Sequence, residues 1–302
     1  MEQNSITSIE SVSLKPTLSE LQQSPLPDNF YTLTGELPFV MTNDALFHLV
    51  LQANPLVLKS LICTLLDKNP EKIRSIEVTN PIILGSTVYT KDFVLDTKIL
   101  LNDNTLINTE LQVLKLKFWK ERSLGYLSRT FDNLNKGDNY VNTKPAIHIG
   151  ILDFDLFPND TEFYATYHMA NDISHQIYSD KFRLSVLQLR QMEHATEADR
   201  QQGRYLWANF FKATNWEEIR MLAEQNPIFA EAAQTIYRVT ADQRVRDLCE
   251  GRREGEKTHN TLVILRDQAL QELEDAKNEL AIKDAYIAEL EAKLKHTKKT
   301  GL

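Results

Sequence analysis

Two stretches of alternating side chains, residues 93–100 and 105–113, constrain the fold of this chain more than any other feature of its sequence. The polar run 102–104 separates them, and runs of Asn and Asp are typical of turns. The pattern therefore predicts an antiparallel hairpin that packs against a core. Each predicted strand nevertheless carries a carboxylate where a buried strand favours an apolar residue, Asp96 in the first and Glu110 in the second. These two acids make the hairpin the candidate functional element.

Strand side chains alternate between two faces, so Asp96 shares a face with Lys98, and Glu110 shares a face with Gln112. If the hairpin register brings those faces together, two carboxylates meet in a partly buried cleft. Like charges there repel and lose hydration, unless a cation joins them. Oxygen ligands on a rigid sheet suit Mg²⁺ or Mn²⁺. On this argument, removing either acid would stabilise the metal-free protein. The alternative is that both acids face solvent on an exposed hairpin, and spacing alone does not choose between the two.

A local surplus of positive charge follows the hairpin, although the net charge of the chain is -8. The acidic net charge argues mildly against a nucleic-acid partner. Between residues 111 and 130, however, five basic side chains stand against the single acid Glu121. Arg122 and Arg129 are seven residues apart and would share one face of a helix. They are candidates for contacts with DNA phosphates, and the alternative is a solvated helix face with salt bridges. The basic residues are Lys115, Lys117, Lys120, Arg122 and Arg129.

The order of apolar patterns predicts an α/β fold with a mixed sheet flanked by helices. We expect a flexible arm over residues 1–30, a core over 31–198, a helical subdomain over 199–255, and a coiled-coil helix with a short tail over 256–302. In the last segment apolar residues recur at alternating steps of three and four, interrupted by Arg266 and Lys283. This pattern predicts a homodimer through a parallel or antiparallel coiled coil, and the alternative is a solvated helix that pairs with nothing. The apolar positions are Leu262, Ala269, Leu273, Ala276, Leu280, Ile287, Leu290 and Leu294.

The cysteines and the apolar runs indicate where the protein works. Cys63 and Cys249 lie far apart, so they suggest neither a disulfide framework nor a metal cluster. We expect them to be buried thiols in a reducing, cytoplasmic setting. The longest apolar runs are too short for a membrane span, and the N-terminus lacks the pattern of a signal peptide.

Several stretches together resemble the Rpn-type recombination-promoting nucleases, also labelled PD-(D/E)xK family transposases, within the PD-(D/E)xK nuclease superfamily. They occur in the family's order, between about residues 37 and 254. The stretches are TNDALFHLVL, KDFVLDTKILLNDNTLINTELQ, ERSLGYLSRTFDNLNKGDNY, KPAIHIGILDFDLF and LAEQNPIFAEAAQTI. The resemblance implies a restriction-endonuclease-like core, divalent-metal dependence and hydrolysis of DNA phosphodiester bonds, in a protein tied to a mobile element or to recombination.

The resemblance also implies site residues. Asp96 and Glu110 match the metal-binding acids, and Gln112 stands where the superfamily has lysine, as in this branch. Asp44 matches an acid of the first helix, although the helix dipole alone favours an acid there. Because Gln112 carries no charge, it can orient a water but cannot stabilise a charged phosphate as lysine does. Lys98 could supply the missing charge, and the alternative is an ordinary surface lysine.

The sequence thus predicts a Mg²⁺-dependent endodeoxyribonuclease. A catalytically weak nuclease fold that acts as a DNA-binding or coiled-coil assembly module is the alternative. His148 is expected to be a core or edge residue rather than a general base. Trp207 and Trp216 are expected to pack between helices rather than to stack on bases.

Overall fold

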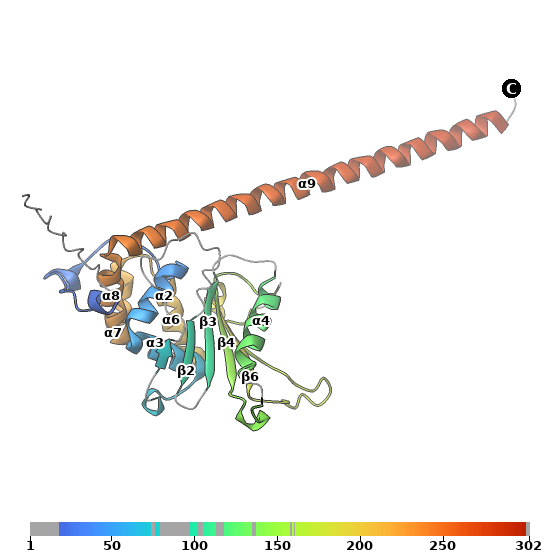
Figure 1. The fold of residues 1–302 in the computed structure, drawn as a ribbon. Coiled ribbons are helices and arrows are strands. Elements are labelled where there is room, and N and C mark those ends of the chain that lie inside the picture. The colour runs from blue at the N-terminus through green and yellow to red at the C-terminus, as the bar shows by residue number, and fades with distance from the viewer. Residues whose placement is uncertain are drawn as a thin grey trace, which may run out of the picture. The chain divides into compact units, whose positions relative to one another are not determined.

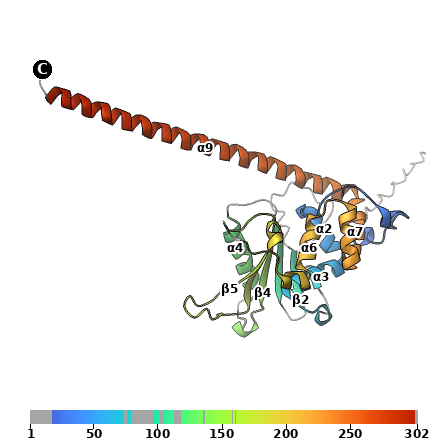
Figure 2. The same ribbon diagram turned by 180° about the vertical axis from the view of Figure 1, so that it is seen from behind.

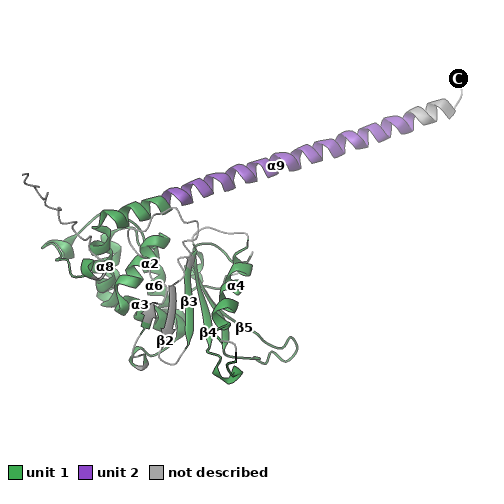
Figure 3. Cartoon of the chain, viewed as in Figure 1, with its two compact units in different colours: residues 1–252 green, residues 253–302 purple. Residues whose placement is uncertain are grey.

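The computed structural model describes residues 18–73, 76–78, 97–101, 105–112, 118–134, 137–157, 159 and 161–299. The chain divides into two compact units, residues 1–252 and residues 253–302 (Figure 3). Asp96 lies outside the described residues, as do Lys115 and Lys117. The backbone of Lys98 is described, but its side chain is not.

A six-stranded mixed sheet forms the centre of the first unit (Figure 1). β3 pairs in parallel with β4, and β4 with β6, whereas the three remaining pairs are antiparallel. β2 and β3 form the predicted hairpin, with Thr97 opposite Thr109. Sheet and helices together confirm the predicted α/β class. In spatial order the strands are β1 Ile76–Val78, β2 Thr97–Leu101, β3 Leu106–Gln112, β4 Ala146–Leu152, β6 Phe182–Gln188 and β5 Tyr164–His168.

Two helices before the sheet supply much of the larger core. Asn43 caps α2 (Asp44–Ala53) by accepting a hydrogen bond from the Leu46 amide at 3.2 Å. Asn54 caps α3 (Pro55–Leu66), and its side-chain amide donates to Thr235 Oγ1 at 2.9 Å. Both helices bury apolar side chains in one cluster with the isoleucines of β3 and β4. No single helix among the described residues is long and apolar enough to cross a membrane.

Most of the helices after residue 196 contribute side chains to the same core, and the reverse view shows these helices from behind (Figure 2). Trp207 is buried among Phe210, Phe211 and Phe229, so its predicted role in helix packing is confirmed. The helices are α5 Glu197–Gln201, α6 Arg204–Lys212, α7 Trp216–Gln225 and α8 Ile228–Thr240.

In the described part of the chain, the opposite face of the sheet carries α4 (Trp119–Phe131). Trp119 packs there in a smaller apolar cluster with Leu152, Phe154 and Val186. The sheet thus has helices on both faces, with the larger core on the side of α2 and α3.

The ends of the chain differ from the sequence interpretation. α1 (Leu18–Leu21) and a short 3₁₀ turn (Phe30–Thr32) belong to the segment expected to be a flexible arm. Leu21 and Phe30 are nevertheless buried, because apolar side chains of the arm reach the core. At the other end, one continuous helix, α9, runs from Gln243 to Lys299 and passes through the expected boundary at 255/256.

Candidate active site

The side chains of Asn108, Glu110 and Gln112 share the face of β3 that packs against α4. Glu110 is buried, with 4% of its surface exposed. Arg122, from the first turns of α4, places its Nη2 atom 2.9 Å from Glu110 Oε1. A buried carboxylate is costly unless it is paired, and this guanidinium provides the opposite charge.

Arg122 contacts several other side chains of this site. Its Nη1 atom lies 3.5 Å from Gln112 Oε1, and its Nε donates to the hydroxyl of Tyr126 at 3.3 Å. The Tyr126 ring lies beneath the guanidinium at 5.3 Å, and Arg129 approaches the same ring at 6.0 Å. The predicted shared face of Arg122 and Arg129 is therefore confirmed. The Arg122 side chain keeps 38% of its surface exposed, so it can reach solvent without repacking of the core.

His148 of β4 completes the buried side of the site. Its Nε2 lies 3.6 Å from Glu110 Oε2, its Nδ1 lies 3.1 Å from Asn108 Nδ2, and its ring stacks on Tyr126. Burial removes hydration from the imidazole and, together with the nearby charge of Arg122, lowers the pKa of His148 to about 3. His148 is thus uncharged near neutral pH, and its expected place in the core is confirmed. The positive charge beside Glu110 comes from Arg122.

Gly150 of β4 lies opposite Glu110 in the parallel register. A Cβ atom at this position would come within 2.5 Å of the Trp119 ring, so glycine allows α4 to pack this closely on the sheet. The sequence pattern did not single out Gly150, Asn108 or Tyr126 as site residues. A glycine within a run of apolar strand residues was the available signal for a close approach.

Asp44 occupies different surroundings at the start of α2. Its Oδ1 lies 3.6 Å from Arg252 Nε, and burial raises the pKa of its carboxyl group while Arg252 opposes the rise. Nearby, Asn43 Nδ2 donates to the carbonyl of Cys249 at 2.8 Å, and burial together with Asp44 raises the pKa of the Cys249 thiol to about 12. Cys249 and Cys63 are buried free thiols, as expected.

Oxygen donors on β3 fit a hard divalent cation. Glu110 and Gln112 offer side-chain oxygens, and Asn108 Oδ1 is buried without a hydrogen-bond partner in the described part of the chain. Within that same part, no group of three or more His, Cys, Asp and Glu side chains converges. Asp96 directly precedes Thr97 in the chain, and Glu110 directly follows Thr109, the partner of Thr97. Lys98 is the backbone partner of Asn108.

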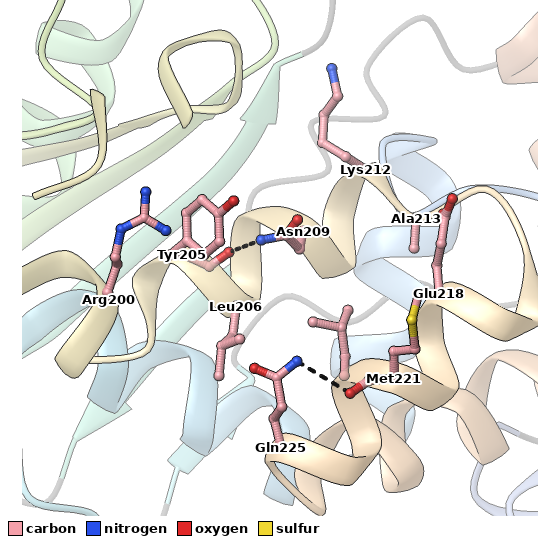
Figure 4. Close-up of a pocket in the computed structure, with 10 residues that line it drawn as sticks. Arg200, Tyr205, Leu206, Asn209, Lys212, Ala213, Glu218, Met221 and Gln225 are labelled. Carbon is pink, nitrogen blue, oxygen red and sulfur yellow. Dashed lines mark hydrogen bonds between the residues drawn. The ribbon is translucent and has the colours of Figure 1, made fainter. Parts of the chain in front are cut away.

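A cavity of about 610 Å³ between α6 and α7 lies apart from these residues (Figure 4). Leu206, Met221 and Leu222 give it apolar walls, and Lys212 at its edge pairs with Asp153 at 3.3 Å. None of the predicted site residues lines it, so it does not mark the candidate active site.

A mixed sheet with a polar hairpin strand, flanked by helices, is the architecture of PD-(D/E)XK nucleases. Residues 42–263 match the family model of the PD-(D/E)XK nuclease family transposases, and the chain belongs to this family. Comparisons with curated proteins and with solved structures find no match.

Proposed function

We propose that the protein is a metal-dependent endonuclease that hydrolyses DNA phosphodiester bonds, in the service of a mobile element or of recombination. The observation that carries this proposal is the burial of Glu110 on β3, paired with a partly exposed Arg122 and flanked by Gln112. A structural salt bridge would not need an amide and a second cation, Arg129, on the same side of the site.

In this proposal Glu110 and Asp96 hold Mg²⁺ or Mn²⁺. When bound, such an ion lowers the pKa of a water molecule and neutralises charge on a phosphate. The carbonyl oxygen of Gln112 orients the attacking water. Asp44 and Lys98 keep their proposed auxiliary roles, Asp44 in positioning and Lys98 in supplying charge.

Arg122 has two roles in this proposal. Without a metal it is the counter-charge of Glu110 at 2.9 Å. Because a cation held by Glu110 would repel the guanidinium, Arg122 would turn toward solvent when a metal is bound, and there it would be free to contact a DNA phosphate. Arg129, on the same helix face, contacts a neighbouring phosphate.

A DNA-binding protein with little or no cleavage is the second candidate function. The observation that favours it is the same ion pair, because a guanidinium at 2.9 Å competes with a metal for Glu110.

We further propose that the protein acts in the cytoplasm and pairs with a second copy through α9. Two buried free thiols and an exposed apolar seam support these two points.

Cleavage of supercoiled plasmid, with and without Mg²⁺, tests the proposal. Glu110→Gln and Asp96→Asn should each lower the cleavage rate by about 10³-fold or more, since each removes a metal ligand. Glu121→Gln is the matched control, because this glutamate lies exposed on α4. Cleavage by Glu110→Gln at the wild-type rate would contradict the site.

Thermal unfolding separates the two candidate functions. A metal that binds the folded protein raises its melting temperature in proportion to the logarithm of metal concentration. Mg²⁺ should therefore stabilise the wild type and Glu121→Gln but not Glu110→Gln. A wild type that binds DNA, gains no stability from Mg²⁺ and leaves plasmid intact would favour the DNA-binding module.

Lys98→Ala examines the proposed source of the missing charge. If Lys98 stabilises the phosphate, this variant should lose about 10²-fold in cleavage rate, and Gln112→Lys should restore part of it. Full activity in Lys98→Ala would remove Lys98 from the mechanism.

A further inference from the structure

The part of α9 in the second unit presents an apolar seam to solvent. Every side chain from residue 264 to residue 293 is exposed. Leu273, Leu280 and Ile287 recur every seven residues and keep 51%, 59% and 52% of their surface exposed. Leu290 follows on the same stripe at 39%. A seam of this spacing is the surface that a second helix covers in a coiled coil.

A charged residue in the seam distinguishes the two possible orientations of that second helix. In a parallel pair each seam position meets its own copy, so Lys283 would face the partner's Lys283. In an antiparallel pair centred between residues 281 and 282, Lys283 faces the partner's Leu280 instead. The ammonium can then leave the seam toward Glu279 of its own helix, where it already lies at 3.3 Å. The antiparallel arrangement thus avoids a repulsive core layer.

An antiparallel pair with the same centre, between residues 281 and 282, also places the small residues of the seam opposite large ones. Ala276 then lies opposite the partner's Ile287, and Leu273 lies opposite the partner's Leu290. The first of these layers pairs an alanine with an isoleucine, and the second pairs two leucines. No layer then sets alanine against alanine, as a parallel pair would at Ala276, so the volumes of successive layers differ less than in a parallel pair.

The charges that border the seam agree with the antiparallel arrangement. With this centre, Lys277 lies beside the partner's Asp284, and Glu272 lies beside the partner's Lys293. Both pairs are attractive, and symmetry produces each of them twice. A parallel pair keeps one attraction, between Glu272 and the partner's Lys277, but sets Glu279 beside the partner's Asp284. Bordering charges of this kind select orientation in coiled coils.

Shifting the antiparallel pair by one heptad removes these attractions. In one direction Asp284 meets the partner's Asp284 across the dyad, although Lys277 then lies beside the partner's Glu291 and Glu279 beside the partner's Lys293. In the other, Lys277 meets the partner's Lys277, and Glu279 meets the partner's Glu279. The bordering charges therefore select the orientation, and like charges that meet at the dyad oppose both shifted registers.

We propose that α9 pairs with α9 of a second copy as an antiparallel coiled coil centred between residues 281 and 282. The inference rests on the proposed pairing of two copies and is independent of the nuclease reaction. The occupant of the exposed seam is thus the same segment of an identical chain.

Disulfide trapping in the full chain tests orientation and register together. Leu273→Cys and Leu290→Cys proteins are mixed under reducing conditions, oxidised and run on a non-reducing gel. The mixture should form a covalent dimer that neither variant forms alone, since only the antiparallel register joins positions 273 and 290. The native Cys63 and Cys249 are buried, so they do not interfere.

Asn278→Cys mixed with Ala285→Cys is the matched control, because these positions are also symmetric about the centre but lie on the outer face of the pair. Cross-linking of either seam variant with itself would overturn the proposal in favour of a parallel pair. A mixture that cross-links no more than the control would overturn the pairing itself. The gel reads neither cleavage nor metal binding, so failure of the nuclease proposal leaves its result unchanged.

Charge reversal provides a second measurement that leaves the seam intact. Lys277→Glu and Asp284→Lys should each weaken dimerisation by about 5- to 30-fold, and the double variant should recover most of the affinity. In a parallel pair Asp284→Lys would strengthen dimerisation, because it relieves repulsion by the partner's Glu279. Light scattering across a concentration series measures the dissociation constant, and a strengthening by Asp284→Lys would overturn the antiparallel orientation.

Discussion

The two faces of β3 and β4 differ in chemistry although they belong to the same strands. The face toward α2 and α3 is largely apolar, and its isoleucines are almost completely buried. The face toward α4 holds an acid, an amide and an imidazole that are just as buried. Burial of polar groups opposes folding unless each has a partner. The isoleucines are Ile107, Ile147, Ile149 and Ile151, and the polar residues are Glu110, Asn108 and His148.

The difference teaches that one face of this sheet mainly stabilises the fold, whereas the other face carries the polar groups of the candidate site. On the apolar side, stability comes from removal of hydrocarbon from water. On the polar side, Arg122 and Tyr126 of α4 supply partners for groups that the sheet alone could not bury. Substitutions on the two faces should therefore affect the free energy of unfolding for different reasons.

The largest loss of stability should follow a cavity on the apolar face. Ile149→Ala removes a fully buried side chain and should lower the free energy of unfolding by about 2–5 kcal/mol. Urea denaturation measures this loss. Cleavage by the fraction that remains folded should match the wild type, and a loss below about 1 kcal/mol would mean that this face is not closely packed.

Removing the acid on the polar face should cost less, and the ion pair with Arg122 predicts the opposite sign from like-charge repulsion. Glu110 is the partner of Arg122, so Glu110→Gln without metal should lower the free energy of unfolding by about 1–3 kcal/mol. A double-mutant cycle with Arg122→Met isolates the pair. Stabilisation by Glu110→Gln in EDTA would show instead that repulsion between acids dominates.

Acid should destabilise the protein through its buried imidazoles. Burial lowers the pKa of both His148 and His48 to about 3, whereas an unfolded histidine titrates near its ordinary value. Between about pH 6.5 and pH 3 the unfolded chain therefore binds more protons than the folded protein, and stability falls as the pH drops through this range. The raised pKa of Asp44 acts in the opposite direction, because the folded carboxyl group takes up its proton earlier.

Between pH 7 and pH 5 each histidine should cost about 1–2 kcal/mol. His148→Gln should flatten the dependence by roughly half, because His48 on α2 still titrates. Melting temperatures across this pH range provide the measurement. An unchanged slope in His148→Gln would indicate that folding does not lower the pKa of His148.

The smallest effect on stability should come from an exposed residue at the edge of the polar face. Arg129 is exposed and approaches only the ring of Tyr126 among the contacts described, so Arg129→Ala should change stability by less than about 0.5 kcal/mol. If Arg129 contacts a phosphate, the salt dependence of DNA binding should become shallower by about one unit of slope. Equal slopes for the wild type and the variant would remove Arg129 from the DNA interface.

The sequence by itself determined the elements and the faces. A period of two places Glu110 and Gln112 on one side of a strand, and a helical period places Arg122 and Arg129 on one side of a helix. Both placements are local, and the structure agrees with them. A heptad spacing likewise indicated the seam of α9.

Only the tertiary structure decided which of these faces meet. Asn108 and His148 are 40 residues apart, and Asn43 and Cys249 are 206 apart, yet each pair is in contact. The parallel register of β3 and β4 and the close approach of Trp119 to Gly150 set the surroundings of Glu110. Periodicity determines the direction of a side chain within its own element. Its neighbours depend on how separate elements pack, because the free energy of burial is shared among residues from all of them.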